Sequence, residues 1–200
     1  MWIGTRQGLA RYDGQVWRAY TPENSGLLDP LVLSIAVAPG SSGERIYFGK
    51  GDGLYLLDVA SGELERVHPE QHNHKNGGIA NLMIDSKGLL WVTTWGFGLH
   101  VWDGTTWMQY TTASSDLPTN RVDSIAEGDP GVYWIGASFQ NQPGGLLARF
   151  DGKEWKIFTS KYKDYSGGAT VAIARDALSR LWFGTQTLGV DIYDPMKKKN

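Results

Sequence analysis

Residues 90–111 read LWVTTWGFGLHVWDGTTWMQYT, and this stretch decides the fold. It holds three short runs, LWVTT, LHVW and WMQY, in which aromatic and β-branched residues typical of β-strands predominate. Asp103-Gly104 separates the second run from the third, and Asp-Gly between two such runs is a strong signal for a tight hairpin turn. The stretch therefore predicts three consecutive antiparallel strands.

The same pattern recurs along the whole chain. The aromatic residues that open it are spaced 45, 44, 43 and 48 residues apart: Trp2, Tyr47, Trp91, Trp134 and Trp182. A further strand-like run precedes each of the four later copies, at residues 32–38, 79–85, 122–128 and 170–176. A unit of four short strands that recurs about every 40 to 50 residues is typical of a β-propeller blade.

The repeat predicts an all-β fold, a β-propeller of four-stranded antiparallel blades, with about four and a half blades present. A partial blade covers residues 1–31, full blades cover 32–78, 79–121 and 122–169, a second partial blade covers 170–195, and 196–200 form a tail. Because blades bury their faces against neighbouring blades, we expect the chain to be part of a larger propeller. A small closed ring and assembly with a second chain are the alternatives.

Composition excludes several classes of function. The chain has 19 Lys+Arg and 21 Asp+Glu, and this balance argues against a nucleic-acid-binding protein. It has no cysteine, which excludes disulfides, cysteine-based metal sites and cysteine nucleophiles. The longest apolar run, residues 31–38, is far shorter than the roughly 18 residues of a membrane-spanning helix, so we expect no membrane contact by this segment.

The repeat consensus, LWIGTxxGLxRYDGxxWxxYT, resembles the two-component-regulator propeller repeat. Residues 115–126, SDLPTNRVDSIA, and residues 24–27, NSGL, match the linker and first strand of that family, and the resemblance extends from Trp2 to about Pro195. It implies the sensor β-propeller of a bacterial hybrid two-component or histidine-kinase regulator. It also implies a periplasmic or extracellular location and a response to oligosaccharides. No kinase segment is present, so we expect any output domain to lie elsewhere.

Candidate binding residues lie on the loops between the second and third strands and on those that join blades. Asp-Gly turns occupy the opposite end of the blades, and rigid scaffolds commonly carry binding residues on their longer, variable loops. The candidates are Arg6, Lys50, Asp52, Trp95, Phe97, Phe139, Gln140, Asn141, Tyr162 and Tyr165. Flat aromatic faces beside amide and charged side chains suit sugar binding. Alternatively, these aromatic residues pack between blades or cover an edge.

His72 and His74 are weak candidates for a metal site, because a third ligand is not identifiable and a solvated polar loop explains them as well. An enzyme, a propeller lyase or hydrolase with a metal-assisted site at Glu70, His72 and His74, rests on fold analogy alone. A protein-interaction platform is a further alternative. The leading hypothesis is a non-catalytic sensor segment, without a cofactor, that binds a small polar ligand such as an oligosaccharide. Its other partner is the rest of the propeller or a second chain.

Overall fold

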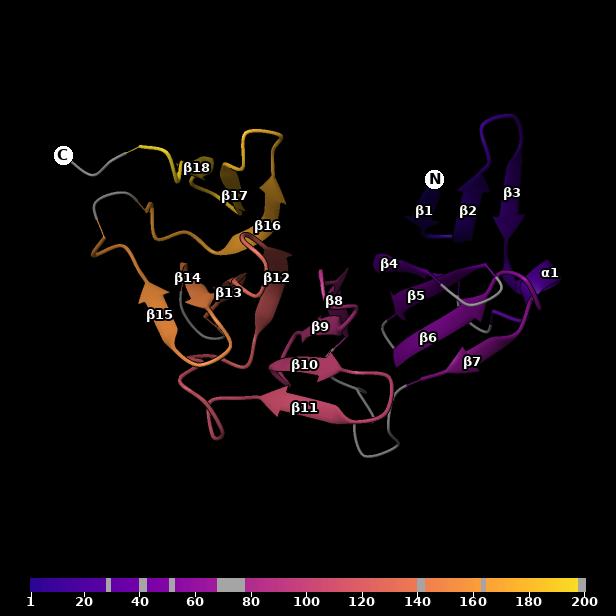
Figure 1. Ribbon diagram of the computed structural model, residues 1–200, viewed down its shortest axis with the longest axis horizontal. Helices are drawn as coiled ribbons and strands as arrows, with labels where there is room; N and C mark the ends of the chain where they lie inside the picture. Colours follow the sequence, from indigo (N-terminus) through magenta and orange to yellow (C-terminus); the bar gives the residue numbers. More distant parts are fainter. Residues whose placement is uncertain are drawn as a thin grey trace. The chain divides into compact units, whose positions relative to one another are not determined.

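The computed structural model describes residues 1–27, 30–39, 43–50, 53–67, 78–139, 143–162 and 165–197 (Figure 1). Within these ranges the strands form five antiparallel sheets of three, four, four, four and three strands. This arrangement confirms the predicted all-β fold with four-stranded blades. The chain divides into two compact units, Met1–Ile84 and Asp85–Asn200.

The first unit begins with a three-stranded meander, followed by a short helix and a four-stranded sheet. The meander is β1 (Trp2–Thr5), β2 (Gly8–Tyr12) and β3 (Trp17–Tyr20), and the helix is α1 (Pro22–Ser25). The sheet pairs β4 (Ser34–Pro39), β5 (Glu44–Lys50), β6 (Gly53–Asp58) and β7 (Leu64–Arg66) in chain order. The last strand of the unit is β8 (Ile79–Ile84). Trp2, Val32 and Phe48 pack together in its core.

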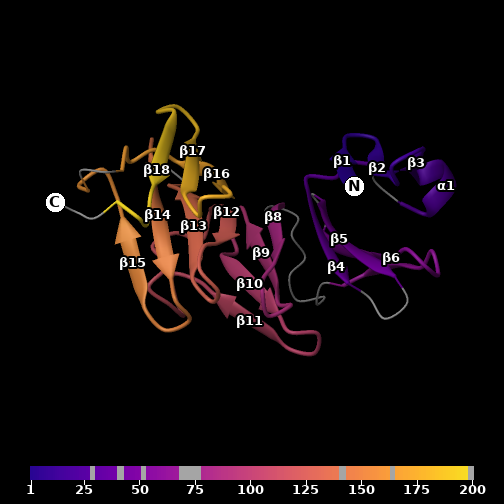
Figure 2. The same cartoon turned by 45° about the horizontal axis from the view of Figure 1, so that its top comes forward.

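The second unit holds β9 (Leu90–Thr94), β10 (Leu99–Trp102) and β11 (Trp107–Tyr110), which pair in that order. A four-stranded sheet follows, with β12 (Val122–Glu127), β13 (Tyr133–Ser138), β14 (Gly145–Phe150) and β15 (Trp155–Phe158). The last sheet has β16 (Thr170–Arg175), β17 (Leu181–Thr185) and β18 (Val190–Tyr193). Figure 2 shows the last two sheets side by side.

Each hairpin from the third to the fourth strand is closed by an aspartate. In the turn after β10, Asp103 Oδ1 accepts hydrogen bonds from the backbone N–H groups of Thr105 and Thr106. These bonds lower the pKa of Asp103, because they stabilise the ionised carboxylate. Gly104 has a φ of 99°, a conformation that side chains with a Cβ adopt with strain. The predicted role of Asp-Gly as a turn is therefore confirmed here.

Successive sheets of the second unit pack through repeated contacts. Trp91 and Tyr133 lie with ring centroids 4.0 Å apart, and both donate hydrogen bonds to Oδ2 of buried Asp85, at 2.8 and 2.7 Å. Between the next two sheets, Gly136 lies against β16, because a Cβ there would collide with the backbone oxygen of Thr170. The recurrence of Trp91, Trp134 and Trp182 in the repeat predicts a structural role for all three. Trp91 and Trp134 are buried packing residues, whereas Trp182 is 36% exposed.

Candidate functional site

A polar and aromatic cluster lies at one end of the second unit, where the turn after β9 meets the segment leading into β12. Trp95 and Arg121 form an isolated β-bridge there. Arg121 Nε donates a hydrogen bond to Ser138 Oγ at 2.7 Å and lies 3.7 Å from Asp123 Oδ1. The indole of Trp95 is 38% exposed. We call these four residues, Trp95, Arg121, Asp123 and Ser138, the loop-end cluster.

Asp123 is the unusual member of the loop-end cluster. Its side chain is only 7% exposed, and among the described residues its Oδ2 has no hydrogen-bond partner. Burial raises the pKa of Asp123, and the nearby Ser138 hydroxyl, the Arg121 charge and the Trp95 indole oppose that rise in part. A buried acceptor without a partner costs free energy unless something else donates to it. Asp123 Oδ2 is therefore a buried acceptor that the described residues leave unsatisfied, and a donor reaches it only if the side chains around it move.

The repeat shows that folding does not require this carboxylate. The equivalent position in the first strand of the other copies is occupied by Leu33, Ala80 and Val171. An aspartate at a position that is otherwise apolar breaks the local pattern, and such departures are expected at functional sites. Sequence reasoning missed Asp123, Arg121 and Ser138. The signal that could have found Asp123 is its mismatch with the other copies.

Phe97 and Phe139 lie close to the cluster in the chain. Phe97 is in the turn between β9 and β10, and Gln109 Nε2 donates a hydrogen bond to its backbone oxygen at 3.0 Å. Phe139 directly follows Ser138, and both phenylalanines are half-buried. The structure thus brings the predicted residue Trp95 together with three polar residues that the prediction did not include, and Phe97 and Phe139 adjoin them.

The remaining candidates belong to the first unit, lie outside the described residues or line a cavity of the second unit. Arg6 is exposed in the turn between β1 and β2, and Lys50 ends β5, so both belong to the first unit. Five predicted site residues lie outside the described residues: Asp52, His72, His74, Gln140 and Asn141. Glu70, named with the histidines in the enzyme alternative, lies outside them too, so that alternative stays a prediction. Within the described ranges, no group of three His, Cys, Asp or Glu side chains is placed to hold a metal ion.

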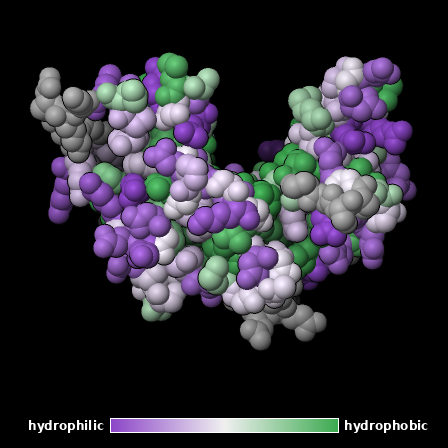
Figure 3. All heavy atoms as spheres, in the orientation of Figure 1, coloured by the Kyte–Doolittle hydropathy of each residue, from purple (hydrophilic) through white to green (hydrophobic). Residues whose placement is uncertain are grey.

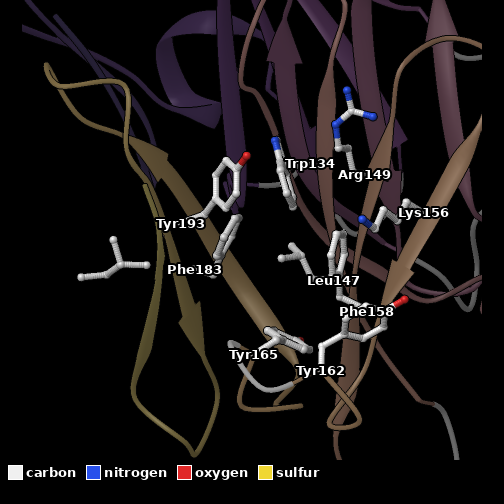
Figure 4. Close-up of a pocket in the computed structure, with 10 residues that line it drawn as sticks. Trp134, Leu147, Arg149, Lys156, Phe158, Tyr162, Tyr165, Phe183 and Tyr193 are labelled. Carbon is white, nitrogen blue, oxygen red and sulfur yellow. The ribbon is translucent and has the colours of Figure 1, made fainter. Parts of the chain in front are cut away.

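Tyr162 and Tyr165 lie at a different place, a cavity of about 300 Å³ between the sheets β12–β15 and β16–β18 (Figure 4). Tyr165 is buried, and its hydroxyl donates to the backbone oxygen of Gly168 at 2.5 Å and lies 3.0 Å from Thr170 Oγ1. It therefore packs between sheets, which was the alternative expected for these aromatic residues. Tyr162 is exposed beside Phe158, with ring centroids 5.0 Å apart. We call this space the aromatic cavity, and its lining residues are Trp134, Leu147, Arg149, Lys156, Phe158, Tyr162, Tyr165, Phe183, Ile192 and Tyr193.

Comparisons with known proteins support the fold. No family model matches the chain. No curated protein matches it either. Among solved structures, it is similar to the extracellular domain of the hybrid two-component system BT3049 of B. thetaiotaomicron. The TM-score is 0.77 at 21% identity, over 98% of this chain and 26% of that one.

Two further solved structures give the same result. The extracellular domain of the hybrid two-component system BT4673 of B. thetaiotaomicron matches with a TM-score of 0.71 at 21% identity, over 96% of this chain and 25% of that one. PorZ, a surface component of the type-IX secretion system of Porphyromonas gingivalis, matches with a TM-score of 0.68 at 17% identity. This match covers 91% of this chain and 28% of that one. The chain therefore spans about a quarter of the length of these structures, and it has their propeller fold. In the part of the chain that the structure describes, no helix has the length and apolar character needed to cross a bilayer.

Proposed function

We propose that this chain is a ligand-sensing segment of an extracellular β-propeller, of the kind found in two-component regulators. In this proposal the loop-end cluster binds a small hydroxyl-rich ligand such as an oligosaccharide. The likeness to two extracellular domains of such systems supports the setting. The single observation that carries the ligand class is Asp123, a buried carboxylate whose Oδ2 has no partner among the described residues and which lies near an exposed indole.

The chemistry of the cluster fits a sugar. The indole of Trp95, which is 38% exposed, would cover the apolar C–H face of a pyranose ring. Asp123 Oδ2 is buried, so it would accept a hydrogen bond from a hydroxyl group once the side chains around it move aside. Arg121, whose side chain is 44% exposed, would donate to a second oxygen. A ligand hydroxyl would satisfy an acceptor whose isolation costs about 1–3 kcal/mol, and this gain occurs only in the bound state.

Binding transmits a signal only if it favours one arrangement of the propeller over another. The loop-end cluster joins residues from two successive sheets, because Trp95 follows β9 whereas Asp123 and Ser138 belong to β12 and β13. A ligand that contacts all of them would favour one spacing of these two sheets. No chemical step is required, so the proposal needs neither a cofactor nor a catalytic residue.

The test is calorimetric titration of the full chain with a panel of oligosaccharides, comparing the wild-type protein with Asp123→Leu and Trp95→Ala. The first copy of the strand carries a leucine, Leu33, at the position equivalent to Asp123, so the Asp123→Leu variant should fold. We expect each change to weaken binding by about tenfold or more. Asp129→Ala, which alters an 80% exposed carboxylate on the segment after β12, is the matched control and should leave affinity unchanged.

Thermal unfolding gives an independent readout. A ligand at about 100 times its dissociation constant should stabilise the wild-type chain by roughly 2.7 kcal/mol and Asp123→Leu by much less. If no oligosaccharide of the panel binds the folded chain, the sugar class is wrong. If a sugar binds but Asp123→Leu binds it as tightly as the wild-type protein, the ligand class survives and the assignment to the loop-end cluster is wrong.

A further inference from the structure

The hydrogen-bond partner of the Arg121 side chain is unexpected. Arg121 Nε donates to the neutral hydroxyl of Ser138 at 2.7 Å, whereas Oδ1 of the Asp123 carboxylate lies 3.7 Å away. Arginine and carboxylate commonly form two parallel hydrogen bonds, which are strong because both groups are charged. Arg121 is therefore bonded to the weaker of two neighbouring acceptors, and Asp123 Oδ2 has no donor among the described residues.

A second arginine of the same unit shows why this matters. Hydrophilic side chains cover much of the visible face of the second unit, and partly exposed arginines are ordinary there (Figure 3). Arg175 also donates to a serine, Ser179 Oγ at 2.9 Å, and lies 3.8 Å from Asp129. Asp129 is 80% exposed, so water can donate to it, whereas the Asp123 side chain is 7% exposed. The two pairs differ in the burial of the carboxylate.

The fold alone does not bury the position of Asp123. The equivalent residues of two other copies, Leu33 and Val171, are 39% and 45% exposed. One difference is the residue two positions earlier, which is Arg121 here. The other copies have Leu31, Gly78 and Ala169 at that place. The Arg121 charge and the Trp95 indole both lower the raised pKa of Asp123, so both lie near its carboxylate. The cover over Asp123 is therefore made by side chains that only this copy has.

The Arg121 side chain is the part of this cover that can move. Its backbone is fixed, because its N–H donates to Thr119 Oγ1 at 3.2 Å and its carbonyl oxygen accepts from the N–H of Ser138 at 3.3 Å. The isolated β-bridge to Trp95 fixes it further. The long side chain is 44% exposed, and among the described residues its one hydrogen bond is the bond to Ser138 Oγ. Breaking that bond frees the guanidinium without disturbing either sheet.

We propose that the Arg121 side chain is a lid over Asp123 and that Ser138 holds this lid closed. In the closed state, which the structure shows, the guanidinium is bonded to Ser138 and Asp123 Oδ2 is covered. In the open state the guanidinium leaves Ser138, so that a hydroxyl group of a ligand reaches Oδ2. The proposal rests on the proposed function for the class of ligand, whereas the lid itself does not depend on which molecule binds.

The lid has a measurable consequence for affinity. Only the open fraction of the protein binds, so the apparent dissociation constant is the intrinsic one divided by that fraction. Removing the Ser138 hydroxyl raises the open fraction and should tighten binding. If Ser138 instead contacted the ligand or supported Asp123, its removal would weaken binding. The sign of the change in affinity therefore separates a residue that holds a lid from a residue that contacts the ligand.

The first test needs no ligand and uses nuclear magnetic resonance on the full chain, comparing the wild-type protein with Ser138→Ala. The exchange of the Arg121 Nε proton with water should be about tenfold faster in the variant, because its acceptor is gone. A neutral gadolinium chelate, used as a probe of solvent access, should relax the Cβ protons of Asp123 at least about twofold faster. Ser138→Thr keeps the hydroxyl and should behave as the wild-type protein does.

The matched control removes the other serine that accepts a hydrogen bond from an arginine. Ser179→Ala breaks the bond from Arg175 and should change neither the exchange of the Arg121 Nε proton nor the relaxation of Asp123. The second test is calorimetry with the oligosaccharide panel. Any member that binds the wild-type protein should bind Ser138→Ala about fivefold more tightly and Ser179→Ala with unchanged affinity.

Three results would overturn the proposal. Unchanged exchange of the Arg121 Nε proton in Ser138→Ala would show that Ser138 does not hold the side chain. Faster exchange without faster relaxation of Asp123 would show that Arg121 is not its cover. Weaker oligosaccharide binding by Ser138→Ala would make Ser138 a ligand contact or a support. If no oligosaccharide binds, the proposed function fails, whereas the two resonance measurements still decide whether the lid exists.

Discussion

The sheets β12–β15 and β16–β18 are built from the same repeat but differ in two ways. In the earlier sheet the repeat tryptophan, Trp134, is buried against the fourth strand and against the following sheet, whereas Trp182 in the later sheet is 36% exposed. The first strand of the earlier sheet carries Asp123, whereas the later sheet has Val171 at that position. The second of these departures coincides with the loop-end cluster. In a repeat protein, the copies define what folding needs, and the exceptions indicate where other demands apply.

The largest difference between the two sheets should appear when their repeat tryptophans are removed. Trp134 packs against Phe158, Phe183 and Tyr193, so Trp134→Ala leaves a large cavity and should lower the free energy of unfolding by about 3–5 kcal/mol. Trp182→Ala removes a ring that is already partly in water and should cost about half as much or less. Urea denaturation of both variants measures these losses of unfolding free energy. Equal losses would contradict the expected difference between Trp134 and Trp182.

A smaller effect on stability is expected from removing the Tyr133 hydroxyl, which connects β13 to the turn before β9 by a hydrogen bond. Tyr133 OH donates to Asp85 Oδ2, whereas the equivalent residue of the last sheet is Leu181, which has no hydroxyl. Tyr133→Phe should lower the free energy of unfolding by about 1–2 kcal/mol, because a buried carboxylate loses one of its donors. Trp91 still donates to the same oxygen, which limits the loss. An unchanged denaturation midpoint would show that the bond contributes nothing net.

Replacing Asp123 should show that its buried carboxylate lowers the free energy of unfolding of the protein. Burial raises the pKa of Asp123, so the folded state binds its proton more tightly than the unfolded state does. Stability from this group therefore falls as pH rises from the unfolded value of about 3.9 through the raised folded value. Asp123→Leu should be more stable than the wild-type protein by about 1 kcal/mol at pH 7, and the gain should disappear near pH 3. If the extra stability of Asp123→Leu does not vary with pH, it does not come from the ionisation of Asp123.

The sequence predicted the sheets well because their determinants are local and repeated five times. Asp103-Gly104 needs only its own turn geometry, and the spacing of Trp91 and Trp134 gives the blade period. The candidate site was predicted less completely. Trp95 is among the predicted residues because it lies on a variable loop, whereas Asp123 lies inside a strand that matches the repeat.

The remaining differences depend on which sheets become neighbours. Tyr165 is among the predicted binding residues, and the structure shows that it is buried, with its hydroxyl hydrogen-bonded to Gly168 and Thr170. Loop position alone does not show whether an aromatic ring faces water or an adjacent sheet. The aromatic cavity was likewise not predictable, because it depends on residues of two sheets and on the edge of β18.

The smallest effect concerns the aspartate that precedes the repeat tryptophan, and it has the opposite sign of pH dependence from Asp123. Asp176 accepts hydrogen bonds from Trp182 Nε1 at 2.9 Å and Arg180 Nε at 2.7 Å, and these bonds lower its pKa to about 2. Its stabilising contribution is therefore present above the unfolded value and is lost as pH falls through about 2. Asp176→Asn should lower the denaturation midpoint slightly at pH 7 and less at pH 2.5. Since the Asp176 side chain is partly exposed, salt should reduce the loss of stability. A loss that grows on acidification would show that Asp176 is not stabilised in its ionised form.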